Sequence, residues 1–179
     1  MKYKSRTCKI VKFLLFFIVV SFLFTQLTYV YRGTLAHTRD NISGYYAEKK
    51  DSLDVVILGT SSTFSAFMPM EIWANYGIAA YNMCTNVLFM DSMKYYVREI
   101  ERTQKPQLLI IDTAPFLYGH KSGAFVSEES HLRYNTDGLV ISRNRFNLIN
   151  AIVPAEKRIE FYFDLFYYHG NEDASVKFL

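Results

Sequence analysis

Residues 54–62 read DVVILGTSS, and the fold class follows from this stretch. The apolar run VVIL, ended by Gly59, is typical of a short strand that is buried on both faces, as strands of a parallel sheet are. The polar residues after the glycine predict a turn toward a helix. A buried parallel sheet is therefore expected.

The segments downstream of this strand alternate between helix and strand patterns. Pro69 suits a first helical position and Gly77 suits a helix end. Residues 91–103 place their apolar side chains on one helical face, while residues 78–83 and 107–112 are apolar runs of strand length. The order β-α-β-α-β predicts an α/β fold, with a parallel sheet, right-handed crossovers and helices in three layers.

The pattern weakens after residue 116. A polar stretch covers residues 123–137, and helices are expected near residues 146–152 and 156–168. Three strands make a small sheet, and no later segment reads as a closing strand. We therefore expect the domain at residues 53–179 to be C-terminally truncated.

The N-terminal part of the chain reads as a membrane anchor. Residues 11–31 (VKFLLFFIVVSFLFTQLTYVY) are long enough to cross the ~30 Å hydrocarbon core of a bilayer. Residues 1–10 form a basic tail that the positive-inside rule places in the cytoplasm, so the main domain is expected outside the cytoplasm. No small-residue cleavage pattern follows, which favours a retained signal-anchor. Residues 32–52 are polar and read as a stalk.

Charge and cysteine usage exclude several classes of function. The chain has 20 Lys and Arg and 17 Asp and Glu, but five of the basic residues lie within the first twelve positions. The remainder has 15 basic against 17 acidic residues and lacks the positive stripe that nucleic acid requires, so no nucleic-acid partner is expected. Cys8 and Cys84 lie on opposite sides of the predicted span and cannot pair. No metal-ligand spacing occurs, and neither a metal nor another cofactor is predicted.

The candidate site is predicted where the strands end. In open α/β sheets, ligands bind beyond the carboxyl ends of the strands, and three polar loops (residues 59–63, 84–86 and 112–115) occupy that position. A serine directly after a glycine-ended strand can present its hydroxyl as a nucleophile while its backbone N–H helps to hold an oxyanion. Ser61 is the candidate. The simpler alternative is an ordinary strand-to-helix turn with a helix cap.

Two motifs carry a resemblance to a known family. Residues 54–62 resemble the first block of SGNH/GDSL hydrolases, and residues 81–85 (YNMCT) resemble the second block. With its anchor and stalk, the chain is most similar to the membrane-anchored, exported branch that includes the D-alanyl-lipoteichoic acid protein and the alginate O-acetylation proteins. The resemblance covers residues 53–115.

The resemblance implies roles for individual residues. Ser61 would be the nucleophile, and the backbone N–H groups of Ser61 and Cys84 would form the oxyanion hole. Gly59, Thr60, Asn82 and Asp112 would be supporting residues.

The chain also departs from the family pattern. The third block's Gly-x-Asn-Asp is replaced by Asp112-Thr113-Ala114, and the closing Asp-x-x-His is absent. None of the four histidines (His37, His120, His131 and His169) has an aspartate three residues before it. Asp112 either orients a partner or caps the following turn, and Cys84 is expected to pack in the core rather than to act as a thiol nucleophile.

Two hypotheses of function follow. The first is a membrane-anchored serine esterase or O-acyltransferase that acts on acylated cell-surface polysaccharide. The alternative is a catalytically inactive accessory protein that binds a membrane-bound O-acyltransferase. Nucleotide binding is disfavoured because the chain has neither a Gly-x-Gly-x-x-Gly motif nor a P-loop lysine.

Overall fold

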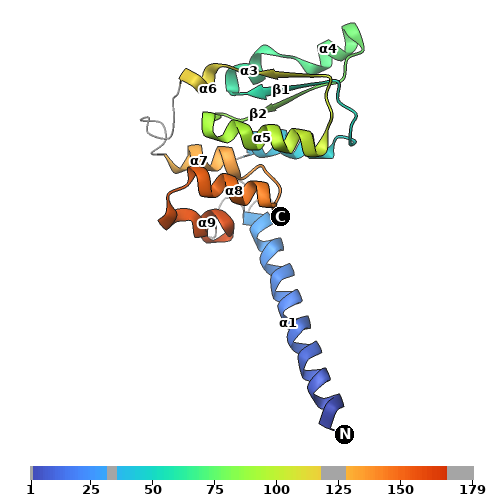
Figure 1. Ribbon diagram of the computed structural model, residues 1–179, viewed down its shortest axis with the longest axis vertical. Helices are drawn as coiled ribbons and strands as arrows, with labels where there is room; N and C mark the ends of the chain where they lie inside the picture. The colour runs from blue at the N-terminus through green and yellow to red at the C-terminus, as the bar shows by residue number, and fades with distance from the viewer. Residues whose placement is uncertain (1, 32–35, 118–127, 169–179) are drawn as a thin grey trace. The chain divides into compact units, whose positions relative to one another are not determined.

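The computed structural model describes residues 2–31, 36–117 and 128–168 (Figure 1). The chain forms two compact units. One unit contains the N-terminal helix α1 (Lys2–Tyr31) and the short helix α10 (Leu165–Tyr168). The other unit, Leu35–Tyr162, contains the sheet and the candidate site.

Helix α1 contains a segment, Cys8–Thr28, that is long and apolar enough to cross a membrane. Its large apolar side chains are exposed, so they are not used as a protein core. Two of its polar side chains bond within the helix: the hydroxyls of Thr25 and Thr28 each donate to the carbonyl four residues earlier at 2.8 Å. The helix overlaps the predicted span at residues 11–31. Within the same unit, the ring of Phe24 packs against two phenylalanine rings at or near the start of α10.

The sheet has three parallel strands, as the sequence predicts. They are β1 (Val55–Gly59), β2 (Ala80–Cys84) and β3 (Leu108–Ile111), in the order β2-β1-β3. Strand β1 is central, and its last four residues are buried. Because all strands are parallel, their carboxyl ends meet at one edge of the sheet.

The connections between the strands are helical, and they cover both faces of the sheet. Helices α3 (Ser61–Ala66) and α4 (Pro69–Tyr76) join β1 to β2, and α5 (Met90–Thr103) joins β2 to β3. Figure 1 shows α3 and α4 on one side of the strands and α5 on the other. As predicted, Pro69 opens α4, and Gly77 ends it with a left-handed φ of 68°. The mixed α/β architecture is confirmed.

The main core lies on the α5 side of the sheet. Val56, Leu58 and Met83 pack there with apolar residues of α5 and of α8 (Arg143–Ile152). Helix α8 confirms the helix predicted near residues 146–152. It begins earlier because the Ser142 hydroxyl accepts a hydrogen bond from the Arg145 N–H at 3.1 Å and caps the helix.

The segment predicted as a stalk is largely part of the folded unit, which corrects the expected boundary at residue 53. Residues 36–47 form helix α2 (Ala36–Ala47), which packs against β2. Ile42 and Tyr45 of this helix are buried in the core, and the ring of Tyr45 lies 5.5 Å from that of Tyr81 on β2. Scattered apolar residues in a polar sequence gave no clear helical pattern, so tertiary packing decides this helix.

The C-terminal part of the folded unit also differs from expectation. The polar stretch at residues 123–137 contains helix α7 (Glu129–Thr136), while residues 118–127 lie outside the described part. The helix predicted over residues 156–168 is broken into a 3₁₀ turn (Ala155–Lys157), α9 (Arg158–Tyr162) and α10.

Two buried arginines account for much of the packing in this region. The Arg133 guanidinium lies 3.9 Å from the centre of the Phe161 ring, and Arg145 donates to the carbonyls of Thr136 and Phe161 at 3.0 Å each. These contacts tie α7, α8 and α9 together through polar groups on buried side chains.

Candidate functional site

The turn after β1 is tightly packed around Gly59. A Cβ atom added to Gly59 would lie 2.3 Å from Thr63 Oγ1 and 2.7 Å from Asp112 Cβ. Thr60 is the N-cap of α3 with an extended backbone, and Ser61 is the first residue of the helix. The glycine therefore allows the first turn of α3 and the end of β3 to approach β1 closely.

The carboxylate of Asp112 joins the loops that follow β1 and β3. Its Oδ2 accepts hydrogen bonds from Thr63 Oγ1 at 2.6 Å, from Thr60 Oγ1 at 2.9 Å and from the Thr60 N–H at 3.3 Å. Its Oδ1 accepts from the Ala114 N–H at 2.8 Å. Asp112 thus caps the following turn, one of the two roles considered from the sequence, and it also binds the first turn of α3.

The environment of Asp112 favours the ionised carboxylate. Burial acts to raise its pKa, but the hydrogen bonds from Thr63, Ala114 and Thr60 together outweigh burial, and the pKa lies below its ordinary value. Charge-assisted hydrogen bonds of this kind are stronger than neutral ones. The turn that presents Ser61 is therefore held by a charged group.

Ser61 lies at the carboxyl end of the central strand with its side chain exposed to solvent. Its carbonyl accepts a hydrogen bond from Ser65 Oγ at 3.1 Å, one helical turn later. The neighbouring Ser62 hydroxyl is engaged with Thr60 Oγ1 at 2.8 Å. Among the described side chains of residues 41–116 and 128–162, none is hydrogen-bonded to the Ser61 hydroxyl, so it is free to meet a ligand.

Cys84 lies at the end of β2 and is a buried thiol. Its Sγ lies 3.7 Å from the Ile57 carbonyl, and burial raises its pKa to about 12. The thiol therefore stays protonated near neutral pH and is a poor nucleophile, in agreement with the packing role expected for it.

The backbone of Cys84 points away from the Ser61 turn. The β1–β2 ladder uses the Thr85 N–H, which donates to the Gly59 carbonyl at 3.2 Å. The Cys84 carbonyl instead accepts from Asn41 Nδ2 of α2 at 2.9 Å. Since the N–H and C=O of an extended residue point to the same side, the Cys84 N–H faces α2. This orientation does not place it beside Ser61 as a second oxyanion donor.

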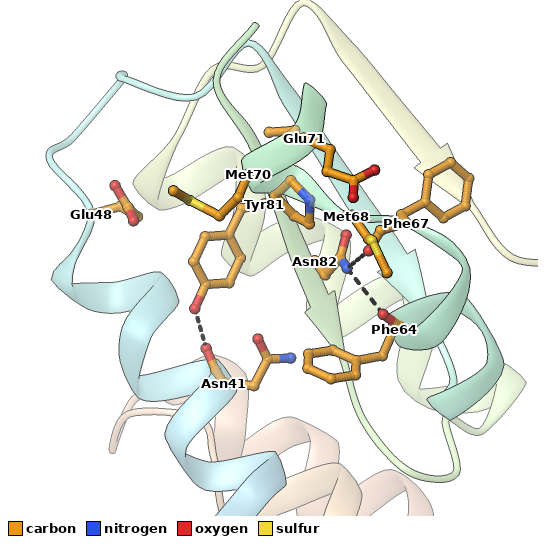
Figure 2. Close-up of a pocket in the computed structure, with 11 residues that line it drawn as sticks. Asn41, Glu48, Phe64, Phe67, Met68, Met70, Glu71, Tyr81 and Asn82 are labelled. Atoms are coloured by element: carbon orange, nitrogen blue, oxygen red, sulfur yellow. Dashed lines mark hydrogen bonds between the residues drawn. The ribbon is translucent and has the colours of Figure 1, made fainter. Parts of the chain in front are cut away.

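Asn82 lies away from the strand ends. Its Nδ2 donates to the carbonyl of Phe67 at 2.9 Å and, more weakly, to that of Phe64 at 3.5 Å, beneath the connection between α3 and α4 (Figure 2). Asn82 therefore supports that connection and lines a separate pocket. The structure brings Gly59, Thr60, Ser61 and Asp112 together, and it leaves Asn82 outside this group.

Of the four histidines, only His131 has a described side chain. It lies on α7, largely buried, with its Nε2 3.5 Å from Glu128 Oε2. His120 and His169 lie outside the described residues, as does the side chain of His37. Among the described residues, no group of three or more His, Cys, Asp or Glu side chains is placed to hold a metal ion.

Sequence reasoning did not single out Thr63, although it makes the shortest hydrogen bond to Asp112. The available signal was its position three residues after the helix cap Thr60, which turns its side chain back toward the strand end.

Comparison with protein-family models, with curated proteins and with solved structures found no match.

Proposed function

We propose that this chain is a membrane-anchored, SGNH-like domain in which Ser61 acts as a nucleophile in esterase or O-acyltransferase chemistry on acylated cell-surface polysaccharide. The observation that carries the proposal is the exposed Ser61 hydroxyl at the end of the central parallel strand, on a turn held by the Asp112 carboxylate. Nucleophilic serines need such a position because the hydroxyl must reach the substrate while its backbone is held rigidly.

The chemistry begins with attack of Ser61 Oγ on the carbonyl carbon of an acyl ester. A base takes the hydroxyl proton, the alcohol leaves with a proton, and the acyl group remains on Ser61. Water or a glycan hydroxyl then takes the acyl group, which regenerates the serine. The Ser61 N–H lies in the first turn of α3, where backbone N–H groups have no partner within the helix, and it is the available donor for the oxyanion.

The apolar segment of α1 supports the location. A helix of this length and hydropathy is suited to a bilayer, and the basic residues before it favour a cytoplasmic N-terminus. The domain would then act on the outer side of the membrane.

Labelling with a fluorophosphonate probe tests the nucleophile. The full-length chain in membranes should form a covalent adduct that peptide mass spectrometry locates at Ser61. Ser61→Ala should abolish the adduct, whereas Ser65→Ala, an exposed serine one turn later on the same helix, should retain it. Absence of a Ser61-dependent adduct would refute the proposed catalytic role.

A second candidate function is an accessory role without chemistry, in which the domain binds a membrane-bound O-acyltransferase. It is favoured because, among the described side chains, none is hydrogen-bonded to the Ser61 hydroxyl, and the nearby Asp112 carboxylate is bound to Thr60, Thr63 and Ala114 instead. In that case, co-purification with an integral-membrane acyltransferase should survive Ser61→Ala. Isolation of the wild-type chain as a lone monomer would count against this role.

A further inference from the structure

A pocket separate from the Ser61 turn lies between α2, the edge strand β2 and the connection from α3 to α4. Its volume is about 600 Å³, within the range of small-molecule sites. Figure 2 shows the side chains of Phe64, Met68 and Met70 around it, together with the carboxylates of Glu48 and Glu71.

The buried amide of Asn82 presents an unsatisfied acceptor in this pocket. Asn82 is 5% exposed, and its Nδ2 faces the carbonyls of Phe64 and Phe67. Because carbonyls only accept hydrogen bonds, the NH₂ group must point toward them, and the orientation of the amide is thereby determined. Among the described residues, its Oδ1 has no hydrogen-bond partner. A buried acceptor without a donor is costly, so a ligand that donates here would be stabilised.

The remaining polar groups that line the pocket add acceptors and negative charge. Glu48 and Glu71 supply carboxylates, and none of the residues that line the pocket is basic. The Tyr81 hydroxyl donates to the Asn41 carbonyl at 2.6 Å, so its proton is already used. Burial, with a smaller effect from Glu48, raises the pKa of Tyr81 to about 12, and the phenol stays neutral. Glu71 lies in the first turn of α4 and offsets the partial positive charge of that helix end.

We propose that this pocket binds a small organic ammonium ion, whose N–H group donates to Asn82 Oδ1 and whose apolar part packs against Phe64, Met68 and Met70. The acceptors and carboxylates select a charged donor, and the methionine side chains adapt to an apolar group of variable shape. The proposal is independent of the chemistry at Ser61, because the residues that carry it are different.

The methionines of the chain provide a direct test. Only six methionines occur, and two of them, Met68 and Met70, line the pocket, whereas Met83 and Met93 are buried in the core. The full-length chain, labelled with ¹³C at the methionine methyl groups and embedded in zwitterionic lipid nanodiscs, would be titrated with n-butylammonium and observed by NMR. Neutral n-butanol and anionic n-butyrate of the same chain length are the matched probes.

Butylammonium should shift the Met68 and Met70 signals in a saturable way and leave Met83 and Met93 unchanged. Its affinity should exceed that of butanol by about threefold or more, and butyrate should not bind. Equal affinity for butanol and butylammonium, binding of butyrate, or equal shifts of all the methionines would overturn the proposal.

Charge-neutral variants separate a real site from nonspecific contact. Glu48 and Glu71 are exposed at the rim, so Glu48→Gln and Glu71→Gln should leave the fold intact and each weaken butylammonium binding about threefold. Glu101→Gln, an exposed glutamate on α5 and away from the pocket, is the control and should have no effect. Unchanged affinity in both pocket variants would refute the ammonium assignment.

Discussion

Replacing Gly59 by alanine tests whether close packing around this residue holds the Ser61 turn. The new Cβ would lie 2.3 Å from Thr63 Oγ1 and 2.7 Å from Asp112 Cβ, so the first turn of α3 must move away from β1. Overpacking of this kind costs about 1–3 kcal/mol. Loss of the 2.6 Å hydrogen bond from Thr63 to the Asp112 carboxylate adds about 1.5–3 kcal/mol. We expect Gly59→Ala to lower the free energy of unfolding by about 2.5–6 kcal/mol.

Thermal unfolding of the full-length chain in non-ionic detergent, followed by near-ultraviolet circular dichroism of the buried tyrosines, measures this cost. In a unit of this size, Gly59→Ala should lower the midpoint temperature of unfolding by roughly 10–20 °C. Thr63→Ala removes the same hydrogen bond without the steric conflict, so the double variant should be less destabilised than the sum of the single variants.

Gly77→Ala is the matched control for the loss of a glycine. Nothing lies within 4 Å of a Cβ added to Gly77. The only cost of this substitution is the left-handed backbone at φ 68°, which should lower the free energy of unfolding by about 1 kcal/mol. If Gly59→Ala were no more destabilising than Gly77→Ala, the close packing of β1, α3 and Asp112 would be disproved.

Three further predictions concern ionisation and exposure. Folding lowers the pKa of Asp112, so its carboxylate stabilises the fold above pH ~4 and loses this effect as the pH falls through the folded pKa. In urea unfolding, the difference in free energy of unfolding between wild type and Asp112→Asn should therefore shrink between pH 5 and pH 2. Glu99 is 1% exposed, and its carboxylate accepts hydrogen bonds from the Tyr46 hydroxyl at 2.7 Å and from Arg102. Glu99→Gln should therefore lower the free energy of unfolding by about 1–3 kcal/mol. An unchanged midpoint of urea unfolding would contradict this. Ser61→Ala should change stability by less than about 0.5 kcal/mol in the same assay, since its hydroxyl is exposed, and a larger loss would indicate a structural role.

Local patterns were sufficient to predict the sheet and its helical crossovers. The apolar run of β1, the Pro69 and Gly77 boundaries of α4 and the apolar face of α5 are each readable over a few neighbouring residues. The same local pattern located Ser61 at a strand end, because a glycine and four polar residues follow the apolar run. Periodicity and turn chemistry act over short distances, so a single sequence displays them.

Long-range contacts could not be predicted from local sequence patterns. Helix α2 is held by the packing of Ile42 and Tyr45 on a strand about forty residues away, and neither residue stands out in its polar segment. The buried Arg133 resembles a surface residue until the ring of Phe161 covers it. Such pairings depend on which segments meet in space, and sequence spacing does not encode that.

The sequence by itself determined the apolar N-terminal helix, the parallel β-α-β-α-β order and the serine at the end of the first strand, because each depends on neighbouring residues. Only the tertiary structure decided how Asp112 is used, because its partners Thr60 and Thr63 lie about fifty residues earlier and meet it through strand pairing. It also decided that Asn82 belongs to a second pocket, since the two carbonyls that orient its amide come from a different segment of the chain.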